Sequence, residues 1–321
     1  MKKIITFFTS ILTVFGIFFA FNSSINTVVA ADDDPMVTLG TSLTSSQRDG
    51  TITKLTNPLN GANYNTITIT GTELVKYLNP SGSNFNTNSG VWSSAMIQKT
   101  NNGSGINVKI LPYNGKNNIT TITANQYKNA ALTAGIADAN IYVTSAVPID
   151  GSGALAGVYA AYAKNGEALN QQQVNAAQDE MNTLSDINEQ NSGKDGYSDA
   201  QLNNAVAGAK AEMAKIGDNV SNSQIADIIN NQITINNLGD VINNNQKQQI
   251  INILINVRDS GALKNSNFKE QAQKLGTQIK ASAQNIFNKL NTAENRNFIQ
   301  KIWDAIVNFF QNLVQTISNW F

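Results

Sequence analysis

The sequence predicts an α+β protein in which an N-terminal mixed α/β domain is followed by a C-terminal all-helical region. Up to about Lys164, short alternating runs of Val, Ile and Thr are separated by Gly, Pro and Asn. Beyond Lys164 these strand signals stop, and apolar residues recur at helical spacing. We therefore divide the chain into a signal peptide (1–30), a mixed α/β domain (31–164), a helical region (165–292) and a terminal amphipathic helix (293–321).

The first thirty residues have the order of a secretory signal peptide. Lys2 and Lys3 give a basic start, an apolar run follows over residues 4–20, and small residues stand at Ala30 and Ala31. This order directs a chain to export and to cleavage, here after Ala30 or Ala31. The alternative is a retained membrane anchor, which the small residues and the lack of a stop-transfer charge cluster disfavour. We expect a secreted, extracellular protein that could also associate with the cell surface.

Four segments of the first part are predicted to be strands. They cover residues 67–70, 106–111, 119–123 and 140–147. The first alternates Ile and Thr strictly and stops at Gly71, which indicates a half-buried strand. The second and the fourth end at Pro112 and Pro148, residues that interrupt a ladder of backbone hydrogen bonds.

Helices are predicted between these strands and throughout the second part. In the first part they cover residues 45 or 46 to 55, 72–78 and 125–138. In the second part they cover residues 167–188, 198–217, 223–230, 245–258, 267–290 and 294–320. Ser198 followed by Gln201 is typical of a helix start, and Gly217 is typical of a helix end.

The chain contains neither histidine nor cysteine. This excludes Ser-His-Asp and Cys-His catalysis and metal sites with His ligands. Any general base would be Asp, Glu, Lys or Tyr, and any metal ligands would be oxygen atoms. The formal net charge is zero, or about −2 without Lys2 and Lys3, since 20 basic and 22 acidic residues then remain. We expect no nucleic-acid partner, and we predict no cofactor and no metal site.

A glycine-rich turn supplies the ligand-binding candidates. Residues 148–157 (PIDGSGALAG) lie between a predicted strand and a predicted helix, where backbone N–H groups can face an anion. The lysine of a nucleotide-binding loop is missing, so a tight turn with close helix–strand packing is the alternative. Arg48 could pair with a ligand carboxylate or with Asp150, and the alternative is a structural ion pair or a solvated helix face. The ligand-binding candidates are Arg48, Asp150, Gly151, Ser152 and Gly153.

The terminal helix has a wide apolar and aromatic face. The residues predicted to contact a membrane or a partner are Ile299, Ile302, Trp303, Ile306, Phe310, Leu313, Ile317, Trp320 and Phe321. Polar residues interrupt the segment too often for it to span a bilayer, but such a helix can lie in a membrane interface. The opposite charges of Lys301 and Asp304 cancel, so the helix has no basic face that would attract anionic lipid. Packing within the protein or within a homo-oligomer is the alternative.

Several motifs resemble a known family. They are Val37 to Gly40, Ser42 to Thr44 with Gln47-Arg48, Ile69 to Gly71, Asn107-Val108, residues 142–149 (YVTSAVPI) and Gly153 to Gly157. Together they resemble a family of secreted Gram-positive bacterial proteins, often called YpuA-like and known as a domain of unknown function, number one thousand and two. The resemblance covers most of the chain from Val37 onward. It implies export and a shared fold, and it brings no catalytic residues.

These observations favour one function and leave an alternative. The favoured function is a secreted, non-catalytic cell-envelope or extracellular interaction protein. Its terminal helix would engage a membrane or a protein partner, and its mixed domain would bind an unidentified ligand. The alternative is a glycosidase-like cell-envelope hydrolase with paired carboxylates, for which the first part offers Glu73, Asp138, Asp150 and Glu167. Two acids about 5–10 Å apart in a cleft would favour this alternative.

Overall fold

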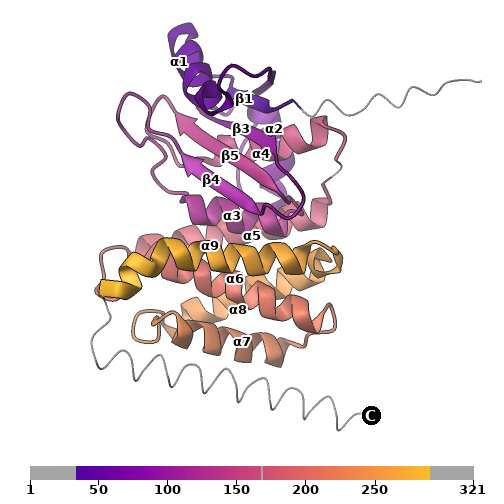
Figure 1. Ribbon diagram of the computed structural model, residues 1–321, viewed down its shortest axis with the longest axis vertical. Helices are drawn as coiled ribbons and strands as arrows, with labels where there is room; N and C mark the ends of the chain where they lie inside the picture. Colours follow the sequence, from indigo (N-terminus) through magenta and orange to yellow (C-terminus); the bar gives the residue numbers. More distant parts are fainter. Residues whose placement is uncertain (1–33, 168, 290–321) are drawn as a thin grey trace, which may run out of the picture. The chain divides into compact units, whose positions relative to one another are not determined.

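The first part of the protein forms a five-stranded mixed sheet with the strand order β2-β1-β3-β5-β4 (Figure 1). The structure is a computed structural model that describes residues 34–167 and 169–289. The β1–β2 and β4–β5 pairs are parallel, whereas β3 is antiparallel to β1 and to β5. The strands are β1 (Met36–Gly40), β2 (Asn65–Ile69), β3 (Ser93–Lys99), β4 (Ile106–Ile110) and β5 (Ala139–Ser145).

Helices cover both faces of this sheet. They are α1 (Ser45–Thr56), α2 (Gly71–Leu78), α3 (Ala124–Thr133) and α4 (Ser152–Lys164). Helix α1 packs on one face, where Val37, Leu39 and Met96 form a small buried cluster with Leu55. The other three helices contribute to the main hydrophobic core, which includes Ile97 and its neighbours on the opposite face. The alternation of β1 and β3 side chains between the two clusters follows from the two-residue period of a strand.

Three of these helices begin at threonines whose side chains cap the first turn. The threonines Thr44, Thr70 and Thr123 are N-caps, and each accepts a hydrogen bond from a backbone N–H of the first turn. In each case the residue three positions later, Gln or Glu, bonds back to the N–H of the cap. Such capping boxes stabilise a helix start, which explains why all three helices begin within one or two residues of the predicted positions.

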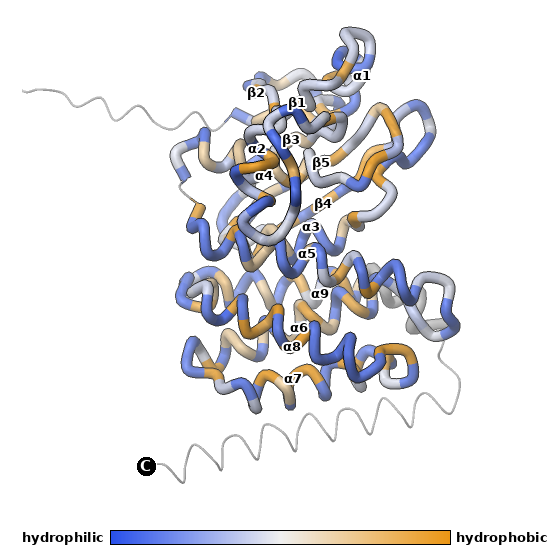
Figure 2. The backbone as a smooth tube through the Cα atoms, turned by 180° about the vertical axis from the view of Figure 1, so that it is seen from behind, coloured by the Kyte–Doolittle hydropathy of each residue, from blue (hydrophilic) through white to orange (hydrophobic). Residues whose placement is uncertain are grey.

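The second part is helical throughout the residues described. Its helices are α5 (Gln171–Asn191), α6 (Asp199–Ile216), α7 (Asn222–Ile235), α8 (Asn244–Asp259) and α9 (Phe268–Lys289). Hydrophilic and hydrophobic turns alternate along α6, α7 and α8, as Figure 2 shows. The predicted start of α6 at Ser198 and its end at Gly217 are confirmed. The predicted α+β class is therefore confirmed, with the sheet first and the helices after it.

The described helices were also compared with the length and apolar character that a membrane span needs. Among the helices of residues 34–289 outside the gap at 168, none is long and apolar enough to cross a bilayer.

Element predictions differ from the structure at five places. Strand β1 was not predicted, and α3 ends at Thr133, five residues before the predicted end. Strand β3 was not predicted, because it begins with two buried serines, Ser93 and Ser94, rather than with an apolar residue. The predicted strand over 119–123 is only an isolated bridge between Ile119 and Ile149, since the chain turns there into the cap of α3. Helix α7 extends to Ile235, five residues beyond the predicted end.

Helix α3 joins the two parts, because it contacts β4 on one side and α5, α6 and α9 on the other. Two of its buried polar side chains, Asn129 and Thr133, form hydrogen bonds with helices of the second part. Lys210 of α6 donates to Glu180 of α5 at 2.5 Å, to the backbone oxygen of Asn129 at 2.9 Å and to its Oδ1 at 3.3 Å. Thr133 donates to the second oxygen of Glu180 at 2.6 Å. All three Lys210 donors are thereby satisfied inside the protein.

The ion pair between Lys210 and Glu180 is fully buried, with 0% and 1% of the two side chains exposed. Burial lowers the pKa of Lys210, and the adjacent carboxylate of Glu180 acts in the opposite direction. A buried pair of this kind contributes little net stability over an apolar pair, but loss of one partner leaves an uncompensated charge in the core.

Double substitution at this pair tests its role. Lys210→Met should lower the free energy of unfolding by about 3 kcal/mol or more, because Glu180 would remain buried without its cation. The double variant Glu180→Gln, Lys210→Met should be more stable than Lys210→Met alone. Urea unfolding followed by circular dichroism measures both effects. Strictly additive losses would contradict the coupling between the two residues.

Candidate functional site

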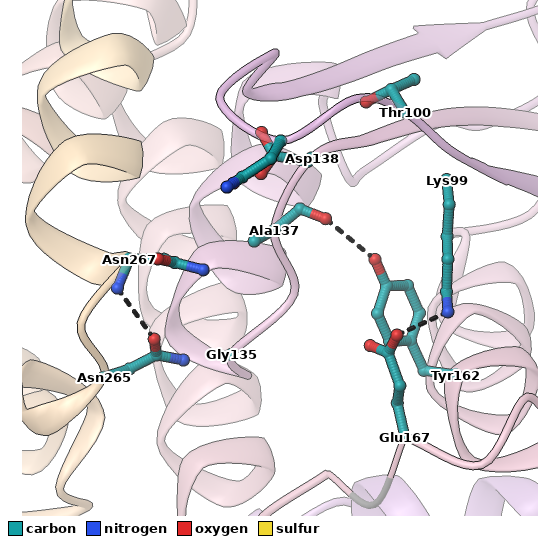
Figure 3. Close-up of a pocket in the computed structure, with 10 residues that line it drawn as sticks. Lys99, Thr100, Gly135, Ala137, Asp138, Tyr162, Glu167, Asn265 and Asn267 are labelled. Carbon is teal, nitrogen blue, oxygen red and sulfur yellow. Dashed lines mark hydrogen bonds and ion pairs between the residues drawn. The ribbon is translucent and has the colours of Figure 1, made fainter.

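A polar pocket of about 380 Å³ lies at the edge of the sheet where β3 ends and β5 begins (Figure 3). The first part of the chain supplies most of its lining, and the loop before α9 completes it. The lining residues are Lys99, Thr100, Asn102, Gly135, Ala137, Asp138, Tyr162, Glu167, Asn265 and Asn267. The pocket therefore combines segments that are far apart in sequence.

Asp138 is held rigidly at one side of the pocket. Its backbone has a positive φ of 46°, a conformation that Asp and Asn adopt more readily than other side chains. Its Oδ1 accepts hydrogen bonds from the Gly105 N–H and from Gln271 Nε2, both at 2.8 Å. Burial raises the pKa of Asp138, but the donors of Gly105, Gln271 and Gly103 and the charge of Lys274 outweigh it. The pKa of this carboxyl thus lies below its ordinary value.

A second carboxylate faces a lysine on the other side of the pocket. Glu167, just beyond α4, forms an ion pair with Lys99 Nζ at 2.5 Å, as Figure 3 shows. Between the two carboxylates lies Tyr162, whose hydroxyl donates to the Ala137 backbone oxygen at 3.1 Å. Burial raises the pKa of Tyr162, and the charges of Glu167 and Asp138 raise it further. The Tyr162 hydroxyl is therefore a neutral donor whose hydrogen is already used.

Two groups of the lining are suited to meet a ligand. The Oγ1 atom of Thr100 is buried, and the residues described provide it with no hydrogen-bond partner. Asn267 is exposed on the loop before α9, and its backbone N–H donates to Asn265 Oδ1 at 3.0 Å. Asn265 is thus used to shape the loop, whereas the side chain of Asn267 faces the pocket region with that of Asn102. An unpartnered buried hydroxyl is costly unless a water or a ligand satisfies it.

The arrangement does not match a pair of acid and base carboxylates. A glycosidase needs one carboxyl with a raised pKa that donates a proton to the leaving group. In this pocket the pKa of Asp138 is lowered, and Glu167 is paired with Lys99. Within the described residues, no group of three or more Asp or Glu side chains could hold a metal ion. Neither carboxyl of this pocket therefore has the environment expected of a general acid.

The predicted glycine-rich turn lies at the opposite edge of the sheet, at the carboxyl end of β5. Asp150 accepts from the Ser152 N–H at 3.1 Å and from its hydroxyl at 2.6 Å. A side chain on Gly151 would collide with the Tyr127 hydroxyl, and one on Gly153 would lie 2.6 Å from Val91 Cγ1. The same residues thus start α4 and let it pack closely on the sheet. A ligand at this turn stays a prediction.

Arg48 lies in the first turn of α1, which follows the carboxyl end of β1. Strand β1 runs in the same direction as β5, with β3 between them. The structure thus brings Arg48 and Asp150 to the same edge of the sheet. Among the described residues no hydrogen bond or ion pair joins them, because the carboxylate of Asp150 is turned to Ser152. The predicted contacts of the terminal helix, from Ile299 to Phe321, lie outside the described residues.

Sequence reasoning missed most of the pocket. Of its lining, Asp138 and Glu167 were named as acids available to an enzyme, but nothing in their spacing connected them. No sequence motif marks the other polar lining residues, which are Lys99, Thr100, Asn102, Asn265 and Asn267. Their proximity depends on the packing of α9 near β5, shown by the bond between Gln271 and Asp138 across 133 residues.

Comparisons with known proteins point to one family. The family described as "Protein of unknown function (DUF1002)" matches residues 39–275. The "Uncharacterized protein YpuA" of Bacillus subtilis (strain 168) is 34% identical to the chain over 189 residues. The match covers 59% of this chain and 60% of that relative, so the chain spans less than two thirds of the relative's length. No solved structure gives a significant match.

The lowered pKa of Asp138 predicts a pH-dependent contribution to stability. The ionised carboxylate stabilises the fold above its unfolded pKa of about 4, and this contribution is lost as the pH falls through the lower folded value. Asp138→Asn keeps an acceptor oxygen and tolerates the backbone, but it should lower the free energy of unfolding at pH 7 by about 1 kcal/mol. The difference from the unmodified chain should shrink near pH 3.

Urea unfolding at pH 7 and pH 3 measures this difference. Asp49→Asn, on the exposed side of α1, is the matched control for removal of one negative charge. A deficit of Asp138→Asn that stays constant between the two pH values would contradict the role of its ionised form.

Proposed function

The chain belongs to the family described as "Protein of unknown function (DUF1002)", and we propose from this premise that it is an exported, non-catalytic binding protein. Its ligand is a small neutral molecule rich in hydroxyl and amide groups. The observation that supports this proposal is the unpartnered Thr100 hydroxyl in a pocket whose carboxylates already have partners. Because the carboxylates are already paired and the hydroxyl is not, such a site favours recognition of a ligand by hydrogen bonds over recognition by ion pairs.

The chemistry of the lining supports the ligand class. The carboxamides of Asn102 and Asn267 can each donate and accept, and the Thr100 hydroxyl can do the same. Lys99 and Glu167 neutralise each other, and the charge of Lys274 acts against that of the ionised Asp138, so neither a strongly anionic nor a strongly cationic ligand is favoured. The vicinal hydroxyl and acetamido groups of an N-acetylated sugar offer donors and acceptors in the same mixture. We infer that such a saccharide is the type of molecule that this pocket accepts.

Hydrolysis is the less favoured function for the same site. Asp138 and Glu167 do line one pocket, which is the arrangement that the alternative hypothesis requires. However, the donors around Asp138 stabilise its ionised form, which disfavours its use as a general acid. Binding without cleavage is therefore the proposal.

Export and surface association are proposed from the two ends of the sequence. The basic, apolar and small-residue order of residues 1–31 supports a cleaved signal peptide. The amphipathic pattern of residues 293–321 supports contact with a membrane surface or a protein partner, including a second copy of the chain. These features support a binding activity at the cell envelope or outside the cell.

Removal of one hydroxyl tests the pocket. We expect chitotriose, a trimer of N-acetylglucosamine, to bind the purified chain in isothermal titration calorimetry. Thr100→Val should weaken this binding about two- to tenfold, because one hydrogen bond to the ligand is lost. The same variant should unfold at an equal or higher urea concentration, since it removes a buried hydroxyl that has no partner within the protein.

Asparagine variants provide the matched control. Asn267→Ala in the pocket should weaken binding, whereas Asn245→Ala, exposed on α8 and outside the pocket, should not. Absence of binding to chitotriose, or equal effects of the two variants, would contradict the proposed ligand class. Release of shorter sugars during incubation would instead support the hydrolase.

Truncation tests the proposals for the two ends of the chain. A chain without residues 297–321 should still be exported, and N-terminal sequencing of the secreted protein should begin at Ala31 or Asp32. The truncation should abolish liposome flotation or self-association of the full chain. This loss should depend little on salt, because the lost attraction is apolar. A full chain that is monomeric and does not float with liposomes would contradict the role of the terminal segment.

A further inference from the structure

A second polar pocket, of about 260 Å³, lies between α6, α7 and α9. Along α6 it is lined by Asn204, Gly208 and Glu212, which are spaced by four residues and therefore share one face of the helix. Gly208 leaves no room for a larger residue, because a side chain there would collide with Gln232 of α7. At Gly276 of α9, by contrast, a side chain would point into open space. Gly208 thus lets the Gln232 side chain lie directly against α6, and Gly276 leaves space on the side of α9.

An unpartnered acceptor marks one end of the pocket. The side chain of Asn204 is buried, and its Oδ1 has no hydrogen-bond donor among the described residues. Its amide orientation is fixed, because Nδ2 donates to Asn236 Oδ1 at 2.5 Å, and Asn236 in turn donates to the Gln232 backbone oxygen at 2.8 Å. The free Oδ1 therefore requires an N–H or O–H from outside the protein.

Opposite charges lie toward the other end. Glu212 accepts a hydrogen bond from Gln232 Nε2 at 2.5 Å. Burial raises the pKa of Glu212, while the Gln232 hydrogen bond and the charges of Lys215 and Lys280 act against this rise. Lys280, on α9, is exposed at the pocket. A carboxylate and an ammonium group thus stand near each other without forming a direct ion pair between Glu212 and Lys280 in the described part.

We propose that this pocket binds a free α-amino acid whose side chain ends in a hydrogen-bond donor, such as glutamine. The ligand carboxylate faces Lys280, its α-ammonium group donates to Glu212, and its side-chain N–H reaches Oδ1 of Asn204. Eight residues of α6 separate Glu212 from Asn204, about 12 Å along the helix axis. An extended glutamine with one hydrogen bond at each end covers a distance of this order.

Other small ligands fit the pocket less well. A metal cation would be repelled by Lys215 and Lys280, and the described residues hold no cluster of three acidic ligands there. A simple anion would meet the carboxylate of Glu212 and the unpartnered oxygen of Asn204. Only a molecule with both charges and an additional donor uses all three features.

Calorimetric titration of the purified full chain with L-glutamine and D-glutamine tests this proposal. At least one enantiomer should bind, and methionine of the same chirality should bind at least about tenfold more weakly, because it lacks the donor for Asn204. Glu212→Gln should weaken glutamine binding at least about tenfold, since a charged hydrogen bond is lost. Lys280→Ala should weaken it about two- to fivefold, because this lysine is exposed.

Two control variants complete the test. Lys269→Ala removes an exposed lysine of α9 that does not line the pocket, and Thr100→Val alters only the first pocket. Both should leave glutamine binding unchanged. If Glu212→Gln does not fold, the comparison of Lys280→Ala with Lys269→Ala decides. No binding of either enantiomer, equal binding of methionine, or loss of binding in Thr100→Val would overturn the proposal.

Discussion

The buried ion pair between Lys210 and Glu180 determines how the two parts of the protein join. Three helices meet at this pair, because Lys210 lies on α6, Glu180 on α5, and Asn129 and Thr133 on α3. Burial of a charge or an amide is costly unless hydrogen-bond partners compensate for the lost water. The pair therefore selects one alignment of the helices against α3. Apolar contacts alone would permit several alignments, since they are not directional.

This alignment has consequences at both pockets. Helix α6 contacts α9, and α9 brings Gln271 to Asp138 at the edge of the sheet. The first pocket thus exists only when the helical part is docked on the sheet. The second pocket lies along the α6 surface that faces α9. Both proposed binding sites consequently depend on the docking that the buried network specifies, although their lining residues differ.

We propose binding rather than catalysis at the first pocket because its acids are already neutralised or hydrogen-bonded. A catalytic carboxyl needs an environment that changes its affinity for protons in the direction of its task. Asp138 is instead surrounded by N–H donors, and Glu167 by Lys99. Family membership adds no assigned activity, so this conclusion rests on the residues themselves.

The sequence by itself determined the fold class and most helix starts. It also excluded catalytic and metal sites that use histidine or cysteine side chains. Caps such as Thr70 and Ser198 act within four residues, so local reasoning finds them. Strand β3 escaped it, because the buried Ser93 and Ser94 are stabilised by distant partners, including the Gly40 and Ala154 N–H groups. The pockets also escaped it, since only the tertiary structure decides which of many Asn, Asp and Lys residues come together. That decision depends on long-range packing, which no local pattern encodes.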